Sequence, residues 1–156
     1  RGIYACPSCY FTGVYSTNCY GALPYAGLSQ TAQIAVAHGA GAIQYSPNLK
    51  KLPAGMPLLA DSINSDSSAG NLTQSCYIRF ASNYGAHARH QNTCNVALSD
   101  GSVTSAGPYF FDELFKNNSL TTSTGTDVHV AVFSSASDFP AGAGVVNGYK
   151  ILNWWK

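Results

Sequence analysis

Charged side chains are scarce in this chain, and long apolar runs are absent from it. Asp, Glu, Lys and Arg make up 10% of the 156 residues, against roughly 25% in an average soluble domain. No cluster of cations exceeds the pair Lys50-Lys51, whereas a phosphate-binding surface needs several cations on one face. No apolar segment approaches the ~20 residues that span a bilayer. We therefore expect no nucleic-acid binding, no membrane contact and no signal peptide from these residues.

Small, polar and aromatic residues take the place of the missing charges. Ser, Thr, Asn, Gly and Ala are abundant, ten residues are Tyr, and the formal net charge is +1. This composition is typical of an extracellular protein with a neutral polar surface and disfavours a cytosolic enzyme. The length suits one domain with a real core, and we find no internal repeat or linker, so we expect a single domain over residues 1–156. The start at Arg1 rather than Met indicates a processed form or a fragment.

Five cysteines in such a chain indicate an oxidising compartment. Two disulfides would leave one thiol over, and any of the five could be the odd one: Cys6, Cys9, Cys19, Cys76 and Cys94. We prefer a bridge between Cys76 and Cys94, because both lie on candidate strands that flank a His-rich segment. Closing this loop would stabilise the fold by about 3 kcal/mol in the chain-entropy model. The second bridge is expected within the first three cysteines, with Cys6 and Cys19 as the candidates.

Two segments have patterns compatible with a helix. Residues 28–42 carry several apolar side chains and contain Gly39 and Gly41, which would end a helix there. The aromatic segment 109–115 predicts one or two helical turns that pack on a sheet. The first of these segments has few charges, and a loop is an alternative for it.

Short strands and tight turns are predicted for much of the remaining chain. Alternating apolar residues and β-branched residues mark the expected strands, which are Leu58–Ala60, Cys76–Phe80, Asn95–Leu98 with its return at Val103, and Asp127–Ser134. A last hairpin is expected at Asn147-Gly148, because this pair is the most favourable one for a type I′ turn. The pattern as a whole predicts an α+β domain built mainly from antiparallel sheet and stabilised by disulfides.

The most informative local pattern is His90, nine further residues, and then Asp100-Gly101. Asp-Gly between two alternating segments is a strong signal for a hairpin turn. We expect Gly101 to take a positive φ as the second turn residue, which is costly for a residue with a Cβ atom. His90 is then expected to hold the start of this hairpin through a hydrogen bond to a carboxylate or a main-chain carbonyl.

This pattern resembles the His-x9-Asp-Gly motif of a large family of prepilin-like bacterial proteins, common in planctomycete and lentisphaera-type bacteria. Three further segments are similar to family segments and follow in the right order, so that the resemblance covers roughly residues 4–103: Ala5–Ser8, Asn18–Gly21 and Leu58–Ser62. Cys9 departs from the family pattern, because an Asp is more usual there, and this favours an extra disulfide.

The resemblance implies the globular head of a type IV pilin-like or pseudopilin-like subunit, displayed outside the cell, with copies of itself as partners. It implies a structural protein with no catalytic residues and no cofactor, in which Asp61, His90, Asp100 and Gly101 serve stability. The hydrophobic N-terminal helix of the family is absent from this chain. Residues 104–156 lie beyond the matched part, and a binding property particular to this member would be expected there.

Several other interpretations of the titratable residues stay open. His90 could work with Asp61 or Asp100 in a metal-dependent hydrolase that also uses His87. The spacing of His87, His90 and Cys94 could ligate zinc if an aspartate supplied the fourth ligand. Calcium, which wants 6–8 oxygens, could use carboxylates near the end of the expected strand and its following loop; these are Asp61, Asp66 and Asp100.

The remaining candidates are a dithiol, a serine hydrolase and a glycan site. Cys6-Pro7-Ser8-Cys9 superficially resembles a redox motif, but no helix that would lower a thiol pKa is expected after it. No Gly-x-Ser-x-Gly elbow is present for a serine hydrolase. Trp154 and Trp155 could form a stacking surface for a secreted glycan-binding or adhesion module, or could alternate between core and solvent on a last strand.

Overall fold

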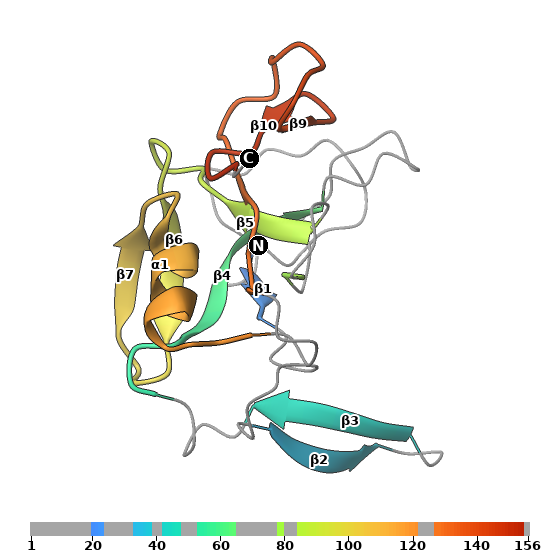
Figure 1. Ribbon diagram of the computed structural model, residues 1–156, viewed down its shortest axis with the longest axis vertical. Helices are drawn as coiled ribbons and strands as arrows, with labels where there is room; N and C mark the ends of the chain where they lie inside the picture. Colours follow the sequence, from blue (N-terminus) through green and yellow to red (C-terminus); the bar gives the residue numbers. More distant parts are fainter. Residues whose placement is uncertain are drawn as a thin grey trace, which may run out of the picture.

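The computed structural model describes residues 20–23, 33–38, 42–47, 53–64, 78–79, 84–121 and 127–154, with the main chain alone for residues 33–38 and 42–47. Its largest element is a six-stranded sheet that curls into half a barrel (Figure 1). The strand order is β7 (Val103–Ala106), β6 (Cys94–Leu98), β4 (Pro57–Asn64), β5 (Tyr84–His87) and β8 (Val132–Phe133), and β1 (Tyr20–Ala22) also pairs with β4. All pairs are antiparallel except the parallel pair of β5 and β8.

Two further hairpins and one helix complete the described structure. The hairpins are β2 (Gln33–His38) with β3 (Ala42–Pro47) and β9 (Val145–Val146) with β10 (Tyr149–Lys150). The helix α1 (Phe110–Asn117) follows β7 and lies across the concave side of the sheet (Figure 1). Among the described residues, no helix has the length and apolar character needed to cross a membrane.

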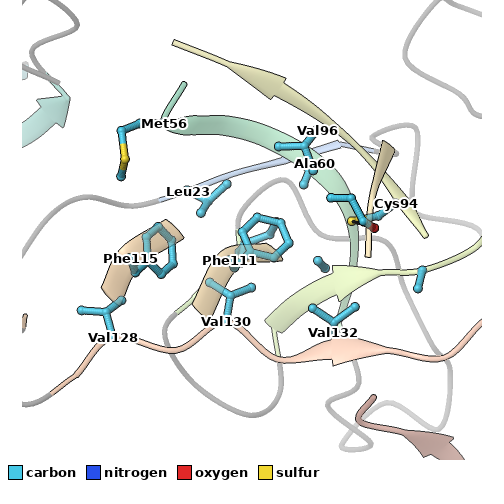
Figure 2. Close-up of a cluster of buried hydrophobic side chains, with 14 of the residues drawn as sticks. Leu23, Met56, Ala60, Cys94, Val96, Phe111, Phe115, Val128, Val130 and Val132 are labelled. Atoms are coloured by element: carbon cyan, nitrogen blue, oxygen red, sulfur yellow. Dashed lines mark hydrogen bonds between the residues drawn. The ribbon is translucent and has the colours of Figure 1, made fainter. Parts of the chain in front are cut away.

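The main core lies between α1 and the concave face of the sheet (Figure 2). Phe111 and Phe115, one helical turn apart, are at most 1% exposed and point into the sheet. Opposite them are small and β-branched side chains from the central strands and from the segment that returns beside α1, namely Ala60, Val96, Val128, Val130 and Val132. Alternation along β6 therefore buries Cys94 and Val96 against the helix.

A smaller core forms on the other face of the sheet, where the C-terminal segment packs. It consists of Ile63, Ala131, Phe133, Tyr149 and Ile151. Strand β4 thus contributes Ala60 to one core and Ile63 to the other, which explains why it is longer than the expected strand Leu58–Ala60.

The fold class predicted from the sequence is wrong. The described structure is mostly β, with ten strands and a single helix of eight residues, and it does not form the α+β pilin-like head that we expected. The largest error concerns residues 28–42, expected to be helical, where β2 and the start of β3 form instead. Ile34 and Val36 alternate with small or polar residues, and β-branched side chains at this spacing favour a strand over a helix.

Several expected elements are confirmed. Helix α1 begins one residue after Tyr109, β6 and β7 form the hairpin expected around residues 95–103, and β9 and β10 form the last hairpin. Asn147 has φ 50° and Gly148 has φ 81°, as a type I′ turn requires. Of the expected strand Cys76–Phe80, only Ile78 and Arg79 belong to the described residues.

The expected strand Asp127–Ser134 is mostly not a strand, because within it Val132–Phe133 alone form a ladder, with β5, and Asp127 forms an isolated bridge with Thr121. A side chain takes the place of a neighbouring strand here. Asn153, fully buried, accepts a hydrogen bond from the main-chain N–H of Val132 at 2.9 Å and donates one to the carbonyl of Val130 at 2.8 Å. The carbonyl of Val130 and the N–H of Val132 are therefore satisfied by this side chain in place of a strand.

Candidate functional site

Asp61 lies at the centre of a buried polar cluster. Its side chain is 0% exposed. The main-chain N–H of Asn95 donates a hydrogen bond to Asp61 Oδ2 at 2.8 Å. His90 Nε2 lies 3.4 Å from the same oxygen, and Arg89 Nε lies 3.7 Å from Asp61 Oδ1. The carboxylate thus has an imidazole, a guanidinium and a main-chain amide around it.

Arg89 closes this cluster from the side. Its side chain is 3% exposed, and its Nη2 donates a hydrogen bond to the carbonyl of Ser62 at 2.8 Å. A buried guanidinium is costly unless it is paired and hydrogen-bonded. The ion pair with Asp61 and this hydrogen bond to β4 offset part of the cost.

A tight turn places Arg89 and His90 over β4. The main chains of His90 and Thr93 exchange two hydrogen bonds, both 3.0 Å long. Gln91 and Asn92 between them have φ 53° and 64°, which are the positive values of a type I′ turn. The hydroxyl of Thr93 also donates a hydrogen bond to the carbonyl of His90 at 2.6 Å. The turn therefore fixes the direction from which the imidazole approaches Asp61.

Asp100 does not meet His90 in this cluster. It lies in the turn between β6 and β7, where its Oδ1 accepts hydrogen bonds from the N–H of Ser102 at 2.9 Å and from its hydroxyl at 2.7 Å. The side-chain bond from Ser102, followed by the main-chain bond, lowers the pKa of Asp100 below its usual value. Asp100 therefore stabilises its own turn, and Asp61 is the carboxylate that pairs with His90.

Gly101 has the expected positive φ, 86°, but the turn is longer than a two-residue one. The N–H of Gly101 donates to the carbonyl of Leu98 at 3.0 Å, and the N–H of Leu98 donates to the carbonyl of Ser102 at 2.8 Å. This is a three-residue loop with a glycine in the left-handed position. Asp100 consequently keeps a negative φ, and Gly101 is the residue that takes the conformation that a Cβ atom disfavours.

Ser99 anchors this loop to the start of β4, a role that the sequence analysis missed. Its N–H donates to the carbonyl of Met56 at 2.7 Å, and its hydroxyl accepts the N–H of Met56 at 3.1 Å and donates to the carbonyl of Pro53 at 2.9 Å. Met56 and Ser99 are 43 positions apart, and the pairing of β4 with β6 brings them together.

His87 is close in sequence to Arg89 and His90, but its side chain is not part of the Asp61 cluster. It is 4% exposed, and its ring meets the ring of Tyr149 edge to face, with 5.8 Å between centroids. Burial first, and then the positive charges of Arg89 and His90, lower the pKa of His87 to about 3. The imidazole is therefore neutral at physiological pH and packs against Tyr149 of the smaller core.

The expected disulfide between Cys76 and Cys94 is not formed in the structure, since Cys94 is a free thiol. It is fully buried in the main core, and its Sγ lies 3.8 Å from the carbonyl oxygen of Ala106. Burial is the main reason that its pKa is raised to about 12. The alternation of β6 directs this side chain toward α1, where it packs as a small apolar group. Cys76, like Cys6, Cys9 and Cys19, lies outside the described residues.

A second polar group, missed by the sequence analysis, joins α1 to the C-terminus. Asp112 Oδ2 accepts a hydrogen bond from Asn153 Nδ2 at 2.9 Å, and Asp112 Oδ1 lies 3.4 Å from His129 Nδ1. Partial burial raises the pKa of Asp112, against the opposite effects of Asn153 and His129. Both Asp112 and His129 line a depression of about 270 Å³ beside α1. In the sequence, the alternating residues around His129 indicated a strand, and nothing indicated a contact between His129 and Asp112.

The structure directs the residues of the proposed metal sites to different partners. His90 faces Asp61, His87 faces Tyr149 and Cys94 faces the carbonyl of Ala106. Within the ranges that the structure describes, no group of three or more His, Cys, Asp or Glu side chains is arranged to hold a metal ion. Asp66, a candidate for calcium, lies outside these ranges, and so does Trp155.

Trp154 is half-buried, with 48% of its surface exposed. Its ring lies against Gly144, where a Cβ atom would stand 3.0 Å from Trp154 Cγ. The main chain at Gly144 thus approaches the indole closely.

Comparisons with family models, curated proteins and solved structures find no match for this chain.

Proposed function

We propose that this chain is a non-catalytic extracellular structural domain, the globular part of a pilin-like or pseudopilin-like surface subunit. The proposal rests on the residues of the His-x9-Asp-Gly pattern and on the Leu58–Ser62 segment that contains Asp61. It does not depend on the α+β fold expected at first, because no helix carries the resemblance. The observation that supports it best is the complete burial of Asp61 between Arg89, His90 and the main chain of Asn95.

The placement of the two aspartates favours a structural role over a hydrolytic one. A general base must reach the proton that it abstracts from a bound substrate or water. Asp61 is 0% exposed, and Asp100 is committed to Ser102 on the surface. The carboxylate, the imidazole and the guanidinium of the cluster instead join β4 to the connection between β5 and β6.

The gene sequence upstream of the Arg1 codon tests the proposal directly. A pilin-like subunit requires a short basic leader, a processing site and ~20 apolar residues before this domain. The matching protein experiment expresses the whole gene with an epitope tag and separates sheared surface filaments from the other fractions. Tag in the sheared fraction supports the proposal. A conventional cleaved signal peptide and a freely soluble secreted product would contradict it.

A second candidate is a secreted glycan-binding module, favoured by the half-exposed ring of Trp154 seated on Gly144. Sugars stack on exposed aromatic faces that are held rigid from behind. A glycan array distinguishes this candidate, because binding that is lost in Trp154→Ala and kept in Tyr109→Ala, which changes another exposed aromatic residue, would support it. An array on which the unmodified chain binds no glycan would contradict this second candidate function.

A further inference from the structure

Strand β7 forms one edge of the described sheet, with a neighbour, β6, on one side (Figure 1). In an antiparallel ladder, the main chains of successive residues face the partner strand and away from it in turn. The hydrogen bond from the N–H of Leu98 to the carbonyl of Ser102 sets this alternation. Thr104, two residues further on, therefore faces β6, and the N–H and C=O groups of Val103 and Ser105 face outward.

These four outward groups bind no other residue in the part of the chain that the structure describes. Natural sheets commonly protect such an edge with a charged residue, a proline or a bulge. The strand Val103–Ala106 has the sequence Val-Thr-Ser-Ala and contains neither charge nor proline. Its first side chain, Val103, is 70% exposed. The edge thus has the properties of a strand that accepts another strand.

An apolar row on the convex face of the sheet leads to this edge. Ala22, Leu59, Ala97 and Val103 are direct neighbours across β1, β4, β6 and β7. Leu59 is 43% exposed and Tyr20 beside it is 37% exposed. Leu59, Ala97 and Val103, with Tyr20, line a depression of about 490 Å³. Exposed apolar side chains that continue up to an unpaired strand edge are typical of an interaction surface.

We propose that β7 pairs with β7 of a second copy of this chain, antiparallel and about a two-fold axis. The alternation of β7 permits one register that satisfies every outward group. Val103 then lies opposite Ser105 of the partner subunit, and these pairs exchange four hydrogen bonds across the axis. Thr104 meets Thr104 of the partner subunit at the axis.

Charge and packing favour a second copy over an unrelated strand. The row and the edge carry no charged side chain among their described residues, so a two-fold contact brings no like charges together. The apolar rows of the two copies would also join at the axis into one continuous strip. This contact goes beyond the surface-subunit role proposed above, because it requires neither a filament nor an N-terminal helix.

Cysteine cross-linking of the 156-residue chain tests the register. Thr104→Cys places two thiols at the axis, where Cα atoms of a non-hydrogen-bonded pair are about 4.5 Å apart, within the range for a disulfide. Val103→Cys is the matched control, because Val103 faces Ser105 of the partner subunit and not its own counterpart. We expect a disulfide-linked dimer on mild oxidation for Thr104→Cys, well above the level of the control and of the unmodified chain. Equal cross-linking in all three would overturn the proposal.

Sedimentation over a range of concentrations tests the contact itself. Ser105→Pro removes an outward N–H that the subunit does not use internally, as an edge strand tolerates, and we expect it to raise the dimer Kd by about tenfold or more. If this variant melts earlier than the unmodified chain, Val103→Lys at the exposed start of β7 replaces it, since two lysines would then flank the axis. A chain that is monomeric throughout, or a dimer that neither variant weakens, would overturn the proposal.

Discussion

His90 Nε2 lies 3.4 Å from Oδ2 of Asp61, a residue 29 positions before it, and not beside the Asp100 with which it shares a sequence motif. The two ends of the motif therefore have different structural roles. His90 covers a buried carboxylate on β4, and Asp100 with Gly101 shapes the turn between β6 and β7. The nine residues between them are the length needed for one tight turn, one strand of five residues and the start of the next turn.

Gly101→Val is expected to lower the free energy of unfolding by about 1–3 kcal/mol through main-chain strain alone. The φ of Gly101 is 86°, and a Cβ atom there would meet nothing within 4 Å, so that crowding does not contribute. Gly107→Ala is the matched control, since a Cβ atom at that position also meets nothing and no positive φ applies. Urea unfolding measures both variants, and an equal stability of the two would contradict the role given to Gly101.

The stability of the fold is expected to fall below pH 6.5 because of His87. Its pKa is about 3 in the folded protein and near 6.5 when unfolded, so the unfolded state binds more protons between these values. Stability therefore rises with pH through this window and is complete above it. The loss from this residue at pH 4 is about 3 kcal/mol.

Urea unfolding at pH 7 and pH 4 measures this dependence. His87→Phe, which keeps an aromatic ring against Tyr149 and removes the titrating group, is the control. A pH dependence that is the same in His87→Phe as in the unmodified chain would show that other groups cause it.

Cys94 is expected to resist alkylation in the folded protein. Its thiol is buried and its pKa is raised to about 12, while the thiolate is the reactive form. Iodoacetamide added first without and then with denaturant, followed by peptide mass spectrometry without reduction, measures this. Labelling of Cys94 only after denaturation would support a free buried thiol. A peptide in which Cys94 is linked to Cys76 would instead restore the disulfide expected from the sequence.

Local signals in the sequence predicted those parts of the fold that depend on local chemistry. Asn147-Gly148 and the glycine of the motif predicted turns, because a positive φ is a property of the residue itself. The segment around Phe111 predicted a helix from its aromatic spacing. Residues 28–42 were misassigned because a weakly charged run of small and apolar residues is compatible with both the helical and the strand periodicity. Pairing between two neighbouring segments decides between the two structures.

The site could be predicted only in part, for the same reason. The sequence indicated a carboxylate or a main-chain carbonyl as the partner of His90, and it left Asp61 and Asp100 as the candidate carboxylates. Pairing of β4 with β6 decides for Asp61, since it brings Asn95 and the preceding turn over that residue. Asn153 and Ser99 carried no signal, because an uncharged polar residue shows its role only when its distant partners are in place.

The most direct test of the structural role of the cluster is the free energy of unfolding of Asp61→Asn beside that of Asp100→Asn. Removing the charge of Asp61 leaves the guanidinium of Arg89 buried without its carboxylate, which should cost about 3–5 kcal/mol. Asp100→Asn changes an exposed side chain and should leave stability nearly unchanged. This large difference is the result we expect. Equal stability of the two variants would contradict the account, since Asp61 would then be buried for a reason other than holding the fold together.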